Sequence, residues 1–250
     1  MRAALALFML LLLTSPAEAG EAATNLLKAA IDHYRGEASW SVMTMRIVRP
    51  DWSREIKMEA WTRGESDSLV TITEPPRDSG SGTLKKGELM WTYNPKINRV
   101  IKIPPSMMSQ SWMGSDFSNN DLARTDSILT DYTHEIDSSS DLGDGHSVVV
   151  LRLVPTPRAP VVWGMLKIKI RNDLVMLEEE YFDEDLKSVK IMTGSDIVNF
   201  DGRHFPKMWT MHKTGKPEEY TQIEYETIDF LDSLPERIFT QRALKEGRRR

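Results

Sequence analysis

The stretch WSVMTMRIV, residues 40–48, decides the fold class because its side chains change character with a period of two. Successive side chains of an extended chain point to opposite faces of a sheet. One face of this stretch carries Met43, Met45 and Ile47, and the other carries Trp40, Val42, Thr44, Arg46 and Val48. A run of this kind, rich in β-branched and aromatic residues, predicts a β-strand.

Eleven further stretches, all C-terminal to residues 40–48, have a similar strand composition. They are Glu55–Thr62, Ser68–Thr73, Glu88–Tyr93, Arg99–Ile103, Tyr132–Ile136, Ser147–Val154, Val162–Ile170, Val175–Phe182, Lys187–Val198, Phe205–Lys213 and Glu219–Phe230. Turn residues such as Asn94-Pro95, Asp144-Gly145 and Asp201-Gly202 separate them. Twelve strands with mostly short connections predict a mainly β (α+β) protein built on one antiparallel meander. No alternating βαβ pattern is present, which excludes a Rossmann fold.

Two parts of the chain depart from this pattern. Thr24–Tyr34 has apolar residues at helical spacing and predicts a short amphipathic helix. Residues 104–130, PPSMMSQSWMGSDFSNNDLARTDSILT, concentrate methionine and aromatic residues between turn residues, and Asn119 or Asn120 could cap a short helix there. This segment either fills one end of a barrel or forms a movable lid, and its methionines favour a surface that adapts to varied apolar partners.

The N-terminus resembles an export signal. Arg2 precedes an apolar run from Ala3 to Leu13, and Ala17-Glu18-Ala19 forms an A-x-A cleavage pattern. The apolar run is too short to span a bilayer as a helix. We therefore expect a signal peptide at residues 1–19, cleavage before Gly20, and a mature periplasmic protein that forms a single domain over residues 20–250.

The composition excludes several classes of site. The chain has 32 Lys and Arg against 37 Asp and Glu, a net charge of −5, and therefore lacks the broad basic face of a nucleic-acid binder. It has no cysteine, which excludes disulfides, thiolate metal sites and iron–sulfur clusters. Its five histidines form no metal-ligand pair.

Local motifs for catalysis and ion binding are equally weak. Gly80-Ser81-Gly82 is followed by Glu88 where a phosphate loop needs lysine, and we interpret this stretch as a flexible hairpin loop. The aspartates of residues 104–131 are spaced five apart, unlike the ligands of a calcium loop, and are expected to be solvated; they are Asp116, Asp121, Asp126 and Asp131. The sequence predicts no catalytic residue, no metal and no cofactor.

Two motifs resemble those of the outer-membrane lipoprotein-sorting family of LolA-like periplasmic carriers, which is related to LolB receptors and RseB-type sensors. The first is AWTRGESDSLVTITEPP at residues 60–76, followed by GELMWTYNP at residues 87–95. The second is IPPSMMSQSWMGSDFSNNDLART at residues 103–125. The resemblance implies a strongly curved antiparallel sheet that forms an unclosed barrel, with helices plugging its open side and an apolar cavity between them.

The resemblance also implies a function. The expected role is a carrier of lipid or of the acyl chains of lipidated proteins, working between an inner-membrane transporter and an outer-membrane acceptor, without nucleic acid. The alternative is a periplasmic sensor or adaptor on the same fold that regulates a membrane protein. Arg63 matches an arginine that latches the lid in the family.

Candidate ligand-binding residues follow from the predicted strands and from the lid segment. The expected cavity wall consists of Met43, Met45, Ile47, Trp61, Leu69, Met90, Trp91 and Ile101. The expected lid contacts are Met107, Met108, Trp112, Met113, Phe117 and Leu122. Ordinary core packing remains the alternative role for each of these side chains.

Overall fold

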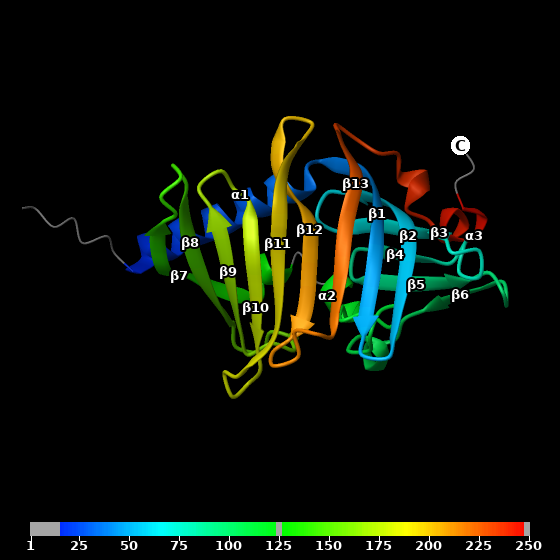
Figure 1. Ribbon diagram of the computed structural model, residues 1–250, viewed down its shortest axis with the longest axis horizontal. Coiled ribbons are helices and arrows are strands. Elements are labelled where there is room, and N and C mark those ends of the chain that lie inside the picture. Colours follow the sequence, from blue (N-terminus) through cyan, green and yellow to red (C-terminus); the bar gives the residue numbers. More distant parts are fainter. Residues whose placement is uncertain (1–15, 124–126, 248–250) are drawn as a thin grey trace, which may run out of the picture.

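The computed structural model describes residues 16–123 and 127–247. Within these residues one sheet holds thirteen strands (Figure 1). They are β1 (Ala38–Arg49), β2 (Trp52–Arg63), β3 (Asp67–Glu74), β4 (Gly82–Lys86), β5 (Leu89–Asn94), β6 (Arg99–Lys102), β7 (Tyr132–Asp141), β8 (Ser147–Pro155), β9 (Met165–Arg171), β10 (Met176–Phe182), β11 (Ser188–Phe200), β12 (Arg203–Lys213) and β13 (Tyr220–Leu231). The helices are α1 (Pro16–Arg35), α2 (Asn119–Ala123), α3 (Gln241–Glu246) and the 3₁₀ turns η1 (Pro105–Met107), η2 (Ser127–Leu129) and η3 (Glu236–Ile238).

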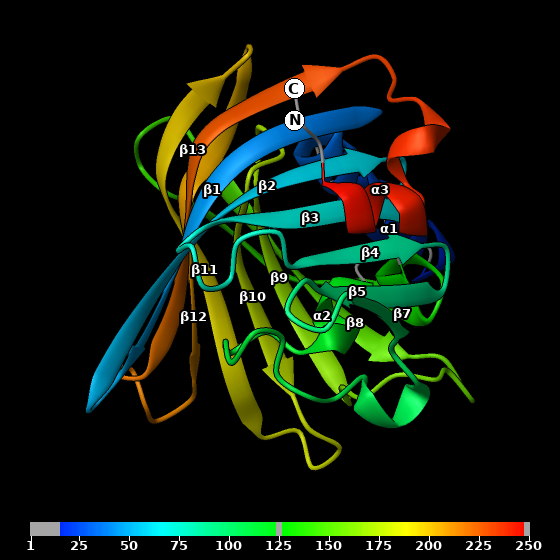
Figure 2. The same cartoon turned by 90° about the vertical axis from the view of Figure 1, so that its right-hand side faces the viewer.

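The sheet is antiparallel throughout and remains open. Its strand order is β6-β5-β4-β3-β2-β1-β13-β12-β11-β10-β9-β8-β7, so the chain begins in the middle, runs to one edge, crosses to the other edge and returns to pair β13 with β1. The edge strands β6 and β7 do not pair with each other. Figure 2 shows the strong curvature of the sheet. The predicted mainly β fold with an unclosed barrel is confirmed.

The alternation in β1 divides its side chains between the two faces as the sequence predicts. Met45 and Ile47 have no exposed surface and pack on the concave face with Ile56 and Met58 of β2. Trp40 on the opposite, convex face packs against a separate cluster that includes Phe239. The concave face of β1 and β2 therefore points into the half-barrel, and their convex face packs against the C-terminal residues.

The sequence interpretation missed one strand. Residues 82–86 form β4, which pairs with β3 and β5, whereas glycines at both ends suggested a flexible loop. Gly82 is required here by close packing, because a Cβ atom would lie 2.8 Å from the carbonyl oxygen of Val70. Leu84 is almost completely buried, and this burial fixes the short strand.

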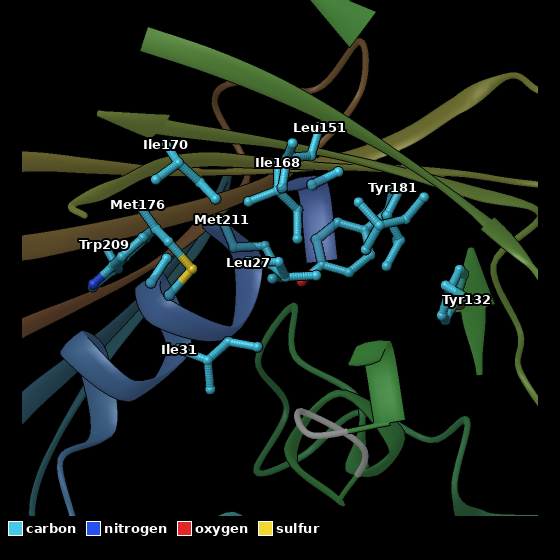
Figure 3. Close-up of a cluster of buried hydrophobic side chains, with 14 of the residues drawn as sticks. Leu27, Ile31, Tyr132, Leu151, Ile168, Ile170, Met176, Tyr181, Trp209 and Met211 are labelled. Carbon is cyan, nitrogen blue, oxygen red and sulfur yellow. The ribbon is translucent and has the colours of Figure 1, made fainter. Parts of the chain in front are cut away.

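Helix α1 covers the concave face of the β7–β12 half of the sheet. Its residue Leu27 lies beside Met211 and Ile168 in Figure 3, and Ile31 belongs to the same apolar cluster. The helix is longer than predicted. Of the expected signal peptide, residues 1–15 lie outside the described residues, and the remaining four are the first residues of α1.

We call residues 103–131, between β6 and β7, the lid segment; its described residues, 103–123 and 127–131, lie on the concave side of the sheet (Figure 2). Helix α2 within it begins with a reciprocal cap. The amide of Asp121 donates to Ser118 Oγ at 3.2 Å, and the amide of Ser118 donates to Asp121 Oδ2 at 2.7 Å. The expected cap by Asn119 or Asn120 is therefore wrong, since both asparagines lie inside the helix.

Candidate functional site

A cavity of about 260 Å³ lies between the concave face of the sheet, α1 and the lid segment; we call it the central cavity. Most of the side chains that line it are apolar. They are Ile31, Tyr34, Met43, Met58, Ala60, Val70, Met90, Trp112, Phe117, Leu122, Ile128, Met176, Tyr181, Met192, Phe205, Trp209, Ile223, Tyr225 and Ile228. The space can therefore hold an apolar ligand out of contact with water.

The polar lining of the central cavity falls into two groups. The first lies on β1 to β4 and the end of α1, and consists of Arg35, Ser39, Ser41, Thr62, Ser68, Thr83 and Lys85. The second consists of Asp121 on α2 and Glu179 on β10, in the other half of the sheet. The cavity lining therefore includes two cationic side chains, Arg35 and Lys85, and two carboxylates, Asp121 and Glu179, that come from different elements.

Four of the predicted wall residues lie on the concave face. Met43 and Met90 line the central cavity. Met45 and Ile47 lie deeper along β1, in the apolar cluster against which the lid methionines pack. The structure therefore places these four side chains together, around the central cavity and beneath the lid segment.

The other predicted wall residues do not line the cavity. Trp61, Leu69 and Trp91 lie on the convex face, where they pack against Phe239 and Leu244 of the C-terminal segment. A shift of one residue in a strand exchanges the two faces, and an apolar side chain does not reveal by itself which face it occupies. Ile101, on the short edge strand β6, is 43% exposed.

Arg63 does not reach the lid segment through any contact within the described residues. Its Nη2 donates to Asp67 Oδ2 at 2.5 Å, and its Nη1 donates to the carbonyl of Leu234 at 3.5 Å. Its guanidinium also lies 4.9 Å from the ring centroid of Phe239. This corrects the expected lid latch, because Arg63 points from the convex face and fastens the C-terminal segment.

The predicted lid residues do gather beneath the lid segment. Trp112, Phe117 and Leu122 line the central cavity, and the indole Nε1 of Trp112 donates to Thr83 Oγ1 at 3.0 Å. The remaining three pack partly buried against the cluster around Met45; they are Met107, Met108 and Met113. The lid segment therefore closes the cavity with its own apolar side chains.

Two buried carboxylates fasten the lid segment to the sheet, contrary to the expectation that they are solvated. Asp116 accepts hydrogen bonds from Thr221 Oγ1 at 2.6 Å and from Arg49 Nη2 at 3.1 Å. Asp121 lies 2.5 Å from Lys190 Nζ on β11, and both side chains are 6% exposed. Asp126 lies outside the described residues.

Aromatic rings and a further carboxylate surround Lys190. Its Nζ lies 4.8 Å from the ring centroid of Trp163 and 4.5 Å from that of Tyr181. Glu179 accepts a hydrogen bond from the Tyr181 hydroxyl at 2.6 Å. Burial raises the pKa of Glu179 despite that hydrogen bond, and the negative charge of Asp121 raises it further.

The part of the chain that the structure describes holds no group of three or more His, Cys, Asp or Glu side chains that could bind a metal ion. Over the same residues, no helix has both the length and the apolar character needed to cross a membrane.

Comparisons with known proteins agree with this architecture. A family model described as "Uncharacterized protein" matches residues 64–246. No curated protein matches the sequence. A DUF1329 family protein from Desulfovibrio piger superimposes with a TM-score of 0.80 at 21% identity, over 90% of this chain and 99% of that one.

Two further solved structures share the fold. An outer membrane lipoprotein-sorting protein domain from Vibrio parahaemolyticus gives a TM-score of 0.78 at 19% identity, over 90% of this chain and 99% of that one. A LolA superfamily protein from Nitrosomonas europaea gives a TM-score of 0.72 at 22% identity, over 88% of this chain and 98% of that one.

Proposed function

We propose that this chain, which belongs to the family whose model matches residues 64–246 and shares the fold of solved LolA-superfamily and lipoprotein-sorting structures, is a periplasmic carrier that holds lipid, or the acyl chains of a lipidated protein, in the central cavity. One observation carries the proposal: a largely apolar cavity of about 260 Å³ is lined by the half-barrel, by α1 and by the lid segment. The description of the Vibrio relative as a lipoprotein-sorting domain supports this class of cargo.

Physical chemistry explains why such cargo requires a carrier. Each buried methylene contributes about 0.8 kcal/mol, so transfer of an acyl chain of ~15 carbons into water costs roughly 12 kcal/mol. Unassisted passage across an aqueous compartment would therefore be extremely slow. A soluble protein that replaces the bilayer around the chain removes most of this cost.

The volume of the central cavity limits how many acyl chains it can hold. Its volume of about 260 Å³ is near the lower end of the range for small-molecule sites, ~300–1,000 Å³. With the lid segment in its present position the cavity suits one chain or one compact lipid. Cargo with several chains requires the lid segment to move, and Asp116 and Asp121 are the attachments that it must release.

The same proposal places the protein between two membranes. The export signal expected at residues 1–19 would leave a mature single domain at residues 20–250 in the periplasm. A carrier there needs a donor and an acceptor, which we propose to be an inner-membrane transporter and an outer-membrane protein. No catalytic step is required of the chain for this role.

The test is to fill the cavity and measure binding. Ala60 lies on the concave face of β2 and lines the cavity, so Ala60→Phe should reduce the affinity for a fluorescent acyl probe at least tenfold. Val42→Phe introduces the same aromatic side chain on the convex face of β1 and serves as the control. Native mass spectrometry of protein isolated gently from the periplasm should show bound lipid. A lipid-free protein that binds no acyl probe would refute the carrier function.

A further inference from the structure

The free edge of the sheet at β6 carries exposed cations. Residues 82–102, which form β4, β5 and β6 with their turns, contain five Lys and Arg residues against a single carboxylate, Glu88. Of the five, Lys85 is buried and Lys86 pairs with Glu236 at 2.7 Å. The other three are exposed and form no ion pair within the described residues; they are Lys96, Arg99 and Lys102.

Two aliphatic side chains are exposed among these cations. Ile97 is 55% exposed in the turn between β5 and β6, where it lies between Lys96 and Arg99 in the sequence. Ile101 on β6 is 43% exposed and precedes Lys102. We call β5, β6 and the turn between them, residues 89–102, the edge hairpin; β6 is the last strand at this side of the sheet (Figure 1).

The edge hairpin continues the wall of the central cavity. Val70 on β3 pairs with Thr83 on β4, and both line the cavity. Thr83 pairs in turn with Thr92 on β5, and Thr92 pairs with Ile101 on β6. Side chains paired in this way project from the same face of a sheet. Neighbouring strands lie about 4.8 Å apart, so Ile101 is the exposed end of this row, about 10 Å from Thr83.

The combination of apolar exposure with cations distinguishes this edge from other exposed turns. Leu186 in the β10–β11 turn is 60% exposed, but Asp183, Glu184 and Asp185 precede it. An anionic surface would be repelled by that turn and attracted by the edge hairpin. Because the whole chain has a net charge of −5, an anionic surface would also orient the molecule with the edge hairpin toward itself.

An anionic bilayer fits the edge hairpin better than an added protein strand does. β6 has only four residues and carries Arg99 and Lys102, and short charged edge strands resist strand addition. Exposed aliphatic groups beside cations are suited to a membrane interface. The aliphatic groups enter the acyl boundary there, and the long cationic side chains reach the lipid phosphates.

We propose that the edge hairpin docks the protein on an anionic bilayer, with its two exposed isoleucines in the interface and its three exposed cations against the lipid phosphates. In this orientation the row that ends at Ile101 connects the membrane surface to the cavity wall. The proposal adds a membrane contact to the carrier function, and it is tested separately from cargo binding.

The test is cosedimentation with phosphatidylcholine vesicles, with and without phosphatidylglycerol. Wild-type protein should bind the anionic vesicles at low salt and dissociate at high salt, because salt screens exposed charges. Each cation near an anionic surface contributes about fivefold in affinity, so Lys96→Gln/Arg99→Gln/Lys102→Gln should bind up to roughly 100-fold more weakly. Ile97→Ser should also weaken binding, since it removes an apolar group from the interface.

Matched variants in the other half of the sheet serve as controls. Lys187→Gln/Lys213→Gln/Lys216→Gln removes the same charge at the turns that follow β10 and β12, and should bind within about threefold of wild type. Leu186→Ser is the control for Ile97→Ser. Thermal unfolding of each variant verifies that it is folded.

Failure of this inference differs from failure of the carrier function. If wild-type protein does not bind anionic vesicles at low salt, or if both triple variants lose binding equally, docking by the edge hairpin is refuted and the carrier function stands. Ala60→Phe, which fills the cavity, should still bind vesicles; loss of vesicle binding in this variant would assign the contact to the cavity and refute the proposal.

A photoreactive group at position 97 tests the identity of the occupant. Irradiation of whole cells should label phospholipid. Labelling of a protein without phospholipid would overturn the assignment of a membrane and identify a protein partner at this edge instead.

Discussion

Replacing Lys190 by methionine should remove one attachment of the lid segment and favour its opening while the sheet stays folded. Lys190 lies on β11 and forms the ion pair with Asp121 of α2, at 2.5 Å, that joins the lid segment to this half of the sheet. Methionine retains most of the apolar stem but lacks the ammonium group. The substitution therefore removes the ion pair with Asp121 and the cation–π contacts with Trp163 and Tyr181, at little change in side-chain volume.

The magnitude follows from the burial of the pair. Both side chains are 6% exposed, and removal of one partner from a buried ion pair typically costs about 3–5 kcal/mol. The amide of Ser118 still donates to Asp121, which favours the lower end of this range. A loss of about 3 kcal/mol corresponds to roughly a 150-fold shift toward the open lid, at 1.4 kcal/mol per factor of ten. The other attachments of the lid segment, at Asp116 and Trp112, remain in place.

The assay measures release of a bound acyl probe by stopped flow, together with amide hydrogen exchange. Release should become about 150-fold faster if opening of the lid limits it. Exchange should increase in peptides covering residues 104–123, including the amide of Asn120 that donates to the Met108 carbonyl at 2.7 Å. Lys216→Met provides the control, because the Lys216–Glu219 pair is exposed and such pairs contribute about 0–1 kcal/mol.

A second substitution distinguishes the electrostatic effect of losing the Lys190–Asp121 ion pair from simple loss of packing. Asp121→Asn in the Lys190→Met background removes the carboxylate charge and keeps a side-chain oxygen for the cap. It should restore part of the lost lid closure. Release within about threefold of wild type in Lys190→Met, or no recovery in the double variant, would refute the assignment of this pair as the lid attachment.

Three further predictions test other parts of the molecule. Trp112→Ala should weaken acyl-probe binding with a small change in melting temperature, whereas a loss near 3–5 kcal/mol with unchanged binding would indicate ordinary core packing. Burial raises the pKa of Glu179 above its ordinary 4.5, so the contribution of Glu179 to stability should fall as pH rises past that value; the melting temperature of Glu179→Gln should rise relative to wild type over that range, and parallel curves would contradict it. Gly82→Ala brings a Cβ within 2.8 Å of the Val70 carbonyl and 2.9 Å of Leu244 Cδ1, and should lower the free energy of unfolding by about 1–3 kcal/mol in urea; an unchanged midpoint would count against it.

The features that sequence predicted well are those set by local pattern. The alternation through Met43 and Met45 identified a strand because period-two alternation is a property of the backbone itself. The interruption at residues 104–130 was visible because prolines and glycines prevent strand continuation there. β4 was missed because five residues between glycines carry too little pattern, and its pairing with β3 and β5 decides its conformation.

The side-chain contacts that attach the lid segment to the sheet could not be predicted from the sequence, for a different reason. Asp121 and Lys190 lie 69 positions apart in the sequence, and Asp116 and Thr221 lie 105 apart. Nothing near either aspartate indicates that it is buried, because its partner arrives only when the second half of the sheet returns to the first. A solvated carboxylate and a buried one have the same local sequence here.

Trp61 and Trp91, which the sequence placed in the cavity wall, instead support that wall from the convex face. A strand that borders an open cavity lacks full packing on that side, so its stability must come from the other face. Trp61, Leu69 and Trp91 supply this support on the convex face of β2, β3 and β5, where the C-terminal segment with Phe239 covers them. Arg63 fastens that segment through the carbonyl of Leu234. The large apolar side chains therefore hold the wall from outside, and the inner face of the same strands can carry hydroxyls, a lysine and adaptable methionines without collapse of the cavity.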